Sequence, residues 1–147
     1  MLSEPVRNVM ERKKVLMAPP DTSVGAAAKL MEKNKVSAVM VVENKHLVGI
    51  FTERDAVFRV IAQDRDVRTT RLFEVMTRAP KTVAPDKSFG YALLLMHENG
   101  FRHVPVIENG EPIGIVSARN ALDPDLEEFE SEARRRKHIG RQTKDDA

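Results

Sequence analysis

The chain contains an internal duplication, which limits the folds that its 147 residues can adopt. After a shift of 65 positions, residues 19–56 align with residues 84–121, and 16 of the 38 aligned positions are identical. Average residue frequencies would give roughly two or three identities in such an alignment. One copy of about 55 residues buries too little apolar surface to be stable as an isolated domain. The two copies should therefore pack on each other, and a binding site should lie where they meet.

Each copy predicts strand, helix, strand, strand, helix, so the fold class is α+β. Apolar residues at helical spacing follow Ser23 and Ser88, and two strand-like runs follow each helix. The first copy predicts its elements at residues 15–17, 23–34, 37–42, 47–51 and 53–63. The second predicts them at residues 81–83, 88–99, 102–107 and 112–116, with a last helix that Pro124 cuts short. The helix at 53–63 is expected to bury Ala56, Val57, Val60 and Ile61.

The domain organisation follows from the repeat. We expect the two repeats at residues 5–63 and 72–122, a polar linker at 64–71, and a C-terminal helix with a polar tail at 123–147. Each repeat opens on a related segment, Val-Arg-Asn-Val-Met at residues 6–10 and Leu-Phe-Glu-Val-Met at residues 72–76. Acidic residues early in the tail and basic residues late in it suit a helix dipole. This helix is expected to cover an exposed edge or a dimer seam.

Composition excludes several classes of function. The chain has no cysteine, so disulfides, thiolate metal sites and cysteine nucleophiles are excluded. The formal charge of +2 arises from 24 basic and 22 acidic residues and makes no case for nucleic acid as a partner. No two histidines stand at metal-ligand spacing with a carboxylate, so no metal site is expected. The N-terminus has no long apolar segment, so we expect a cytoplasmic protein with no membrane contact.

A short motif occurs in both copies, Gly-Ile-Phe-Thr-Glu-Arg-Asp at residues 49–55 and Gly-Ile-Val-Ser-Ala-Arg-Asn at residues 114–120. An apolar run that ends in a hydroxyl residue, followed three positions later by a carboxylate or carboxamide, indicates a strand that leads into a helix N-terminus. The hydroxyl and the acid can cap the helix. They can equally bind the phosphate and ribose of a ligand, because a helix N-terminus attracts anions. Both interpretations stay open at this point.

These motifs, with Pro-Asp-x-Ser before each first helix and Val104-Pro105 in the second copy, resemble a tandem pair of CBS domains, or Bateman module. The resemblance covers roughly residues 5–122. It implies two pseudo-symmetric repeats that meet through their sheets, with clefts at the seam for AMP, ADP, ATP, S-adenosylmethionine or NAD. Carried onto this sequence, it implies twelve nucleotide-binding residues: Met17, Ala18, Ser37, Ala38, Thr52, Asp55, Thr82, Val83, Arg102, His103, Ser117 and Asn120.

Within that set, the resemblance implies distinct roles. Thr52 and Asp55 match the phosphate-side hydroxyl and the ribose carboxylate, and Ser117 and Asn120 match the same pair in the second repeat. Arg102 and His103 match positions that face phosphate. Ser37 and Ala38 occupy the same positions in the first repeat and offer only a hydroxyl and backbone groups there. Met17, Ala18, Thr82 and Val83 would supply the wall and backbone that hold adenine. Arg54 and Arg119, identical in both copies, either reach phosphate or stay solvated.

The predicted function is a regulatory sensor that binds an adenine nucleotide and signals through a homodimer or through an effector protein that the sequence does not identify. No Ser, His and Asp set can be assembled with confidence, so neither catalysis nor a catalytic cofactor is expected. The alternative is a protein interaction module that has the same fold and binds no ligand. A third hypothesis, an enzyme acting on a nucleotide, requires turnover of the bound ligand.

Overall fold

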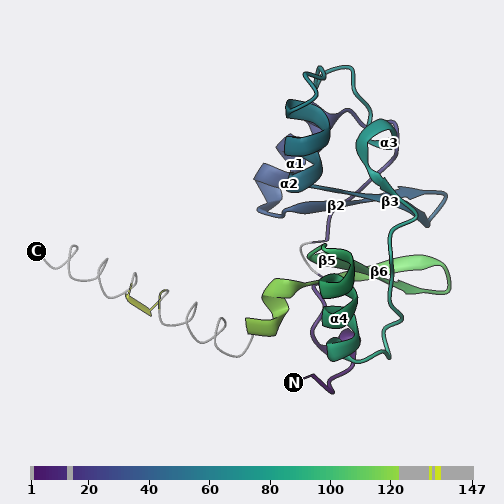
Figure 1. Ribbon diagram of the computed structural model, residues 1–147, viewed down its shortest axis with the longest axis vertical. Helices are drawn as coiled ribbons and strands as arrows, with labels where there is room; N and C mark the ends of the chain where they lie inside the picture. Colours follow the sequence, from purple (N-terminus) through teal and green to yellow (C-terminus); the bar gives the residue numbers. More distant parts are fainter. Residues whose placement is uncertain (1, 13–14, 123–132, 134, 137–147) are drawn as a thin grey trace, which may run out of the picture.

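The fold consists of two similar repeats whose sheets face each other across a seam (Figure 1). The computed structural model describes residues 2–12, 15–122, 133, 135 and 136. The first repeat contains β1 (Met17–Ala18), α1 (Val24–Asn34), β2 (Ala38–Glu43), β3 (His46–Thr52), α2 (Glu53–Asp55) and the π-helical segment η2 (Ala56–Ile61). The second contains α4 (Phe89–Asn99), β5 (His103–Glu108), β6 (Glu111–Ser117) and the 3-10 helix η3 (Ala118–Leu122). The predicted α+β class is confirmed. The predicted C-terminal helix lies largely outside the described residues.

Local sequence signals account for the ends of these elements. Ser23 and Ser88 cap α1 and α4, because each hydroxyl accepts a hydrogen bond of 3.1 Å from a backbone N–H three residues later. Gly100 ends α4 with a left-handed φ of 71°, and Lys35 ends α1 in the same conformation with φ 54°. Both β-hairpins close through two residues of positive φ, of which Asn109 and Gly110 form the second pair.

The prediction of a regular α-helix at residues 53–63 is wrong in part. Three α-helical residues lead into the π-helical segment η2, in which the N–H of Ala62 donates to the carbonyl of Val57 at 2.9 Å. A π-helix has more residues in each turn than an α-helix. Side chains three or four residues apart therefore no longer lie on one face of the helix. Val60 is buried as expected, but Val57 is 48% exposed and Ile61 is 66% exposed.

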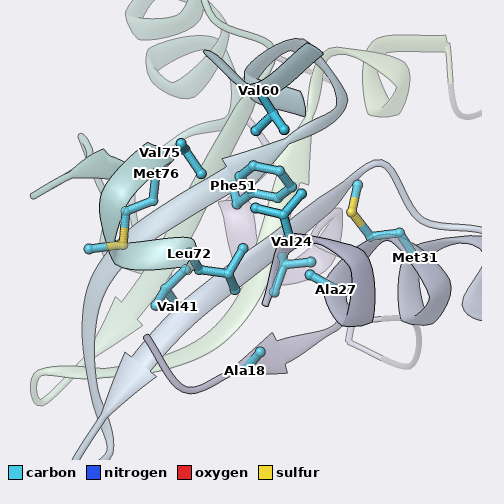
Figure 2. Packing of buried hydrophobic residues seen from close by; sticks show 11 residues of the cluster. Ala18, Val24, Ala27, Met31, Val41, Phe51, Val60, Leu72, Val75 and Met76 are labelled. Atoms are coloured by element: carbon cyan, nitrogen blue, oxygen red, sulfur yellow. The ribbon is translucent and has the colours of Figure 1, made fainter. Parts of the chain in front are cut away.

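The related segments 6–10 and 72–76 each pack on the repeat other than the one whose predicted bounds contain them. η1 (Val6–Asn8) begins at a fully buried Val6 in the core of the second repeat. α3 (Leu72–Val75) packs in the core of the first repeat, where Leu72, Val75 and Met76 lie around Phe51 (Figure 2). The strand β4 (Thr77–Arg78) then pairs with β3, and Glu11 pairs with Ile115 of β6 in the corresponding way. Each core is therefore completed by a segment from outside its own predicted repeat.

The glycine that opens each repeated motif makes room for this exchange. A Cβ atom at Gly114 would lie 2.8 Å from Met10 Sδ and 2.9 Å from the carbonyl oxygen of Glu11. At Gly49, it would collide with the Met76 side chain. Both distances are far shorter than carbon contacts allow. The glycines are thus required by the close approach of the exchanged segments.

Side chains also link the repeats across the seam. Ser37 Oγ and His103 Nε2 are hydrogen-bonded at 2.9 Å, and His46 Nδ1 donates to the carbonyl of Gly110 at 3.2 Å. Arg54 donates to the carbonyl of Gly100 at 3.1 Å and caps the end of α4 from the other repeat. Among the residues that the structure describes, no helix is long and apolar enough to cross a membrane.

Candidate functional site

A cavity of about 920 Å³ lies between the repeats and draws its walls from both of them. Small-molecule sites usually occupy about 300 to 1,000 Å³. Part of the wall is apolar and includes Leu16, Met40, Phe51 and Ile115. The polar part is formed by Ser37, Glu53, His103, Ser117, Arg119 and Asn120, with further charged groups at Glu11, Glu32 and Lys35. A cavity with an apolar wall and a few polar groups has the composition of a small-molecule site.

Five of the twelve predicted nucleotide-binding residues line this cavity: Ser37, Ala38, His103, Ser117 and Asn120. They come from the start of β2, the start of β5 and the end of β6, which the antiparallel pairing brings to one side of the seam. The structure thus gathers residues that lie up to 83 positions apart, from Ser37 to Asn120. Whether they contact a nucleotide stays a prediction.

The other predicted residues lie elsewhere. Thr52 and Asp55 are not part of the cavity wall, and they bond to each other at the start of α2. Met17, Thr82 and Arg102 are exposed, with Met17 at 43%, whereas Ala18 and Val83 are buried in the two cores. Their predicted contacts with adenine or phosphate remain untested.

In both motifs, the side chain of the last residue accepts hydrogen bonds from the hydroxyl residue three positions earlier. Asp55 Oδ2 accepts from the Thr52 backbone N–H at 2.9 Å and from the Thr52 hydroxyl at 3.2 Å. Its Oδ1 lies 3.6 Å from Arg59 Nε. Asn120 Oδ1 accepts from the Ser117 backbone N–H at 2.8 Å in the same way. Thr52 and Asp55 therefore form a full capping box, whereas in the second motif Asn120 only accepts from Ser117; this second pair lines the cavity as well.

His103 is the titratable group most affected by its surroundings. Burial lowers the pKa of His103 below its ordinary value of 6.5, and the nearby positive charges of Arg102 and Arg119 lower it further. At neutral pH the ring is therefore uncharged, and it shares its hydrogen bond with Ser37 across the seam. A neutral imidazole can still donate one hydrogen bond to a phosphate oxygen, but it adds no positive charge.

This environment predicts that stability falls in acid. Because the pKa of His103 is lower in the folded protein, the unfolded chain binds the proton more readily below pH 6.5. The free energy of unfolding should thus decrease from about pH 7.5 to about pH 5, and His103→Gln should reduce that decrease. Urea unfolding at several pH values measures both quantities. An identical pH dependence in wild type and variant would contradict the prediction.

Several cavity residues were not predicted from the sequence. Leu16 lines the cavity although the adenine wall was predicted at Met17 and Ala18. Alternation along an extended segment places Leu16 and Ala18 on one face, so it does not separate a cavity residue from a core residue. Met40, Phe51 and Ile115 were hidden for the same reason, because an apolar strand residue looks the same whether it faces a core or a cavity. Arg119 lines the cavity, whereas its counterpart Arg54 bonds across the seam.

Comparisons with known proteins agree with this architecture. The family profile described as "CBS domain" matches residues 6–62 and 72–125. The CBS domain-containing protein CBSCBSPB1 from Arabidopsis thaliana is 35% identical over 86% of this chain, which spans only 23% of that relative. A putative signal-transduction protein with CBS domains from Burkholderia ambifaria is 29% identical, with a TM-score of 0.76 over 84% of this chain and 94% of that one.

A further solved structure contains a ligand. The CBS domain protein PAE2072 from Pyrobaculum aerophilum, in complex with AMP, is 25% identical, with a TM-score of 0.72 over 80% of this chain and 89% of that one. The duplication, the paired sheets and the family match lead to one conclusion. The chain belongs to the CBS-domain proteins and contains a tandem pair of CBS domains.

Proposed function

We propose that this chain is a regulatory module that binds an adenosine-containing ligand in the cavity between its repeats. The observation that carries the proposal is the cavity itself, which combines an apolar wall with hydroxyl, amide, imidazole and guanidinium groups from both repeats. An aromatic base suits the apolar wall, and a ribose and a phosphate suit the polar groups. The AMP complex of the relative from Pyrobaculum aerophilum supports this class of ligand.

A ligand in this position would act on the arrangement of the two repeats. It would touch Ser37 on one repeat and His103, Ser117 and Asn120 on the other, and the Ser37–His103 hydrogen bond joins these two surfaces. A ligand shifts such an equilibrium only by the difference between its affinities for the two arrangements. Binding should therefore be read out as a small change in how the repeats sit against each other.

The signal would leave the module through a homodimer or through an effector protein. η2 connects the cavity with the surface, because Ala56 and Val57 line the cavity while Phe58 and Ile61 are 56% and 66% exposed. Exposed apolar side chains in one short segment favour contact with another protein surface. These residues also favour the second candidate function, an interaction module of the same fold that has no ligand.

Calorimetric titration with AMP tests the proposal. The wild-type protein should bind AMP, and Asn120→Ala should weaken binding about tenfold, the equivalent of about 1.4 kcal/mol, because it removes an amide from the polar wall. Asn99→Ala is the matched control, since its amide bonds to the carbonyl of Leu95 at 2.8 Å on an exposed face of α4. The absence of heat with adenosine, AMP and S-adenosylmethionine at millimolar concentration would favour the interaction module instead. Conversion of the bound ligand during incubation would indicate an enzyme.

A further inference from the structure

Arg54 and Arg119 hold the same position in the two motifs, 65 residues apart, but their contacts differ. Arg54 Nη1 donates at 3.1 Å to the carbonyl of Gly100 in the other repeat. Arg119 lines the cavity, and the structure gives it no hydrogen bond or ion pair with a described residue. The duplication thus places one arginine in a contact between the repeats and leaves the other beside the ligand site.

The helix ends that these arginines could cap also correspond. Gly100 ends α4 and Lys35 ends α1, and both adopt the left-handed conformation, with φ angles of 71° and 54°. The last carbonyls of a helix have no partner within it and attract a cation. Arg54 supplies that cation for α4, whereas Lys35 and Arg119 both line the cavity and are not bonded to each other. The seam is therefore closed by an arginine at the end of α4 and left open as a cavity at the end of α1.

Arg54 lies outside the cavity wall but belongs to a segment that forms part of it. Glu53, the residue before it, lines the cavity, and its backbone N–H donates at 3.1 Å to the carbonyl of Ser37, a further wall residue. The guanidinium carbon of Arg54 lies 5.5 Å from the centre of the Phe58 ring, which helps to hold the side chain in place. The bond from Arg54 to Gly100 therefore sets where this part of the wall stands relative to the second repeat.

We propose that Arg54 is a positioning residue for the ligand. Its bond with Gly100 holds the two repeats in the arrangement in which the cavity wall is complete, and the ligand does not touch it. A protein whose binding-competent arrangement is only partly populated binds with an affinity reduced by that fraction. The hydrogen bonds that Ser37 and His46 form across the seam would still join the repeats without Arg54. This inference rests on the proposed function and adds to it a residue that acts from outside the cavity.

Calorimetric titrations of the full chain with adenosine and with AMP test the inference. Arg54→Ala should weaken the binding of both compounds by the same factor, about fivefold, because a lower population of the competent arrangement reduces both affinities equally. Arg54→Lys should recover part of the loss, since an ammonium group can still donate to the Gly100 carbonyl. Arg78→Ala is the matched control, because Arg78 is exposed and donates at 3.1 Å to the carbonyl of Phe73, which lies five residues earlier and not across the seam.

Hydrogen exchange separates positioning from simple helix capping. The N–H groups of Gly100 and Phe101 both donate to the carbonyl of Met96 at the end of α4. In ligand-free Arg54→Ala these two groups should exchange faster than in the wild type, and saturating AMP should slow them again, because the ligand selects the arrangement in which it binds. A loss of protection that AMP leaves unchanged would show that Arg54 only caps α4, which contradicts the inference.

The binding outcomes distinguish the inference from the proposed function. Unchanged or tighter binding by Arg54→Ala, or an equal loss in Arg78→Ala, would overturn the positioning role while leaving the ligand site in place. A loss confined to AMP would show that Arg54 contacts the phosphate directly, and this also contradicts the inference. Failure of both compounds to bind the wild-type protein would overturn the proposed function, and the inference with it.

Discussion

Gly114→Val is expected to lower the free energy of unfolding by about 3 to 4 kcal/mol. The new side chain would have to displace Met10 Sδ and the carbonyl of Glu11, which stand 2.8 and 2.9 Å from the position of its Cβ. A backbone carbonyl cannot move away by a change of rotamer. The segment containing Val6 would therefore shift, and a side chain that is fully buried in the second core would become exposed. Urea unfolding of the purified variant measures the loss.

Gly49→Val provides the matched comparison. The three atoms nearest to a Cβ at this position all belong to the Met76 side chain, which can rearrange more easily than a backbone. The free energy of unfolding should therefore fall by less in Gly49→Val than in Gly114→Val, by about 1 to 3 kcal/mol. Adding Met10→Ala to Gly114→Val should recover only part of the stability, because the contact with the Glu11 carbonyl remains. Equal losses at the two glycines would show that the backbone contact at Glu11 is unimportant.

Local elements were predictable because their signals lie within a few residues of each other. Ser23 and Ser88 cap the helices that they precede in sequence, and Asn109 and Gly110 adopt the positive φ angles of a two-residue turn. The strands β5 and β6 begin and end within one residue of their predicted bounds. Duplication strengthened each of these predictions, since a signal present in both copies is rarely accidental.

The exchange of segments 6–10 and 72–76 could not be predicted. The two segments are alike in sequence, so either could complete either core, and only the path of the chain between the repeats decides. The geometry of η2 was equally hidden, because the apolar spacing at residues 56–61 is that of an ordinary α-helix and no residue type in it marks a π-helical turn.

The polar residues of the candidate site were predictable, but its apolar wall was not. Ser37, His103, Ser117 and Asn120 were identified from the motifs and the family resemblance, and they meet in one cavity. The two motifs nevertheless differ in the structure, since Ser117 and Asn120 line the cavity while Thr52 and Asp55 do not. Two motifs with identical spacing therefore need not both line the cavity, because each pair lies among different neighbouring side chains.

Asp55→Ala is expected to lower the free energy of unfolding by about 2 kcal/mol. Asp55 is only 8% exposed, and its carboxylate accepts hydrogen bonds from the backbone N–H and the hydroxyl of Thr52. Its removal leaves these donors without their acceptor at the start of α2. Arg59, which donates to the Met76 carbonyl at 2.9 Å, would also lose the carboxylate beside it. This ion pair contributes little by itself, because Arg59 is half exposed.

Asp55→Asn separates capping from ligand binding. Asn120 already shows that an amide oxygen accepts the same backbone hydrogen bond, at 2.8 Å, so the asparagine variant should retain most of the stability. Because Asp55 lies outside the cavity wall, neither substitution should change the affinity for AMP by more than about twofold. The sequence-based prediction of a ribose carboxylate requires the opposite result, a loss of affinity in both variants that exceeds the loss in Asn120→Ala. Unfolding curves and calorimetric titrations of the same three proteins decide between a helix cap and a sugar ligand, because only the second role ties affinity to the charge at position 55.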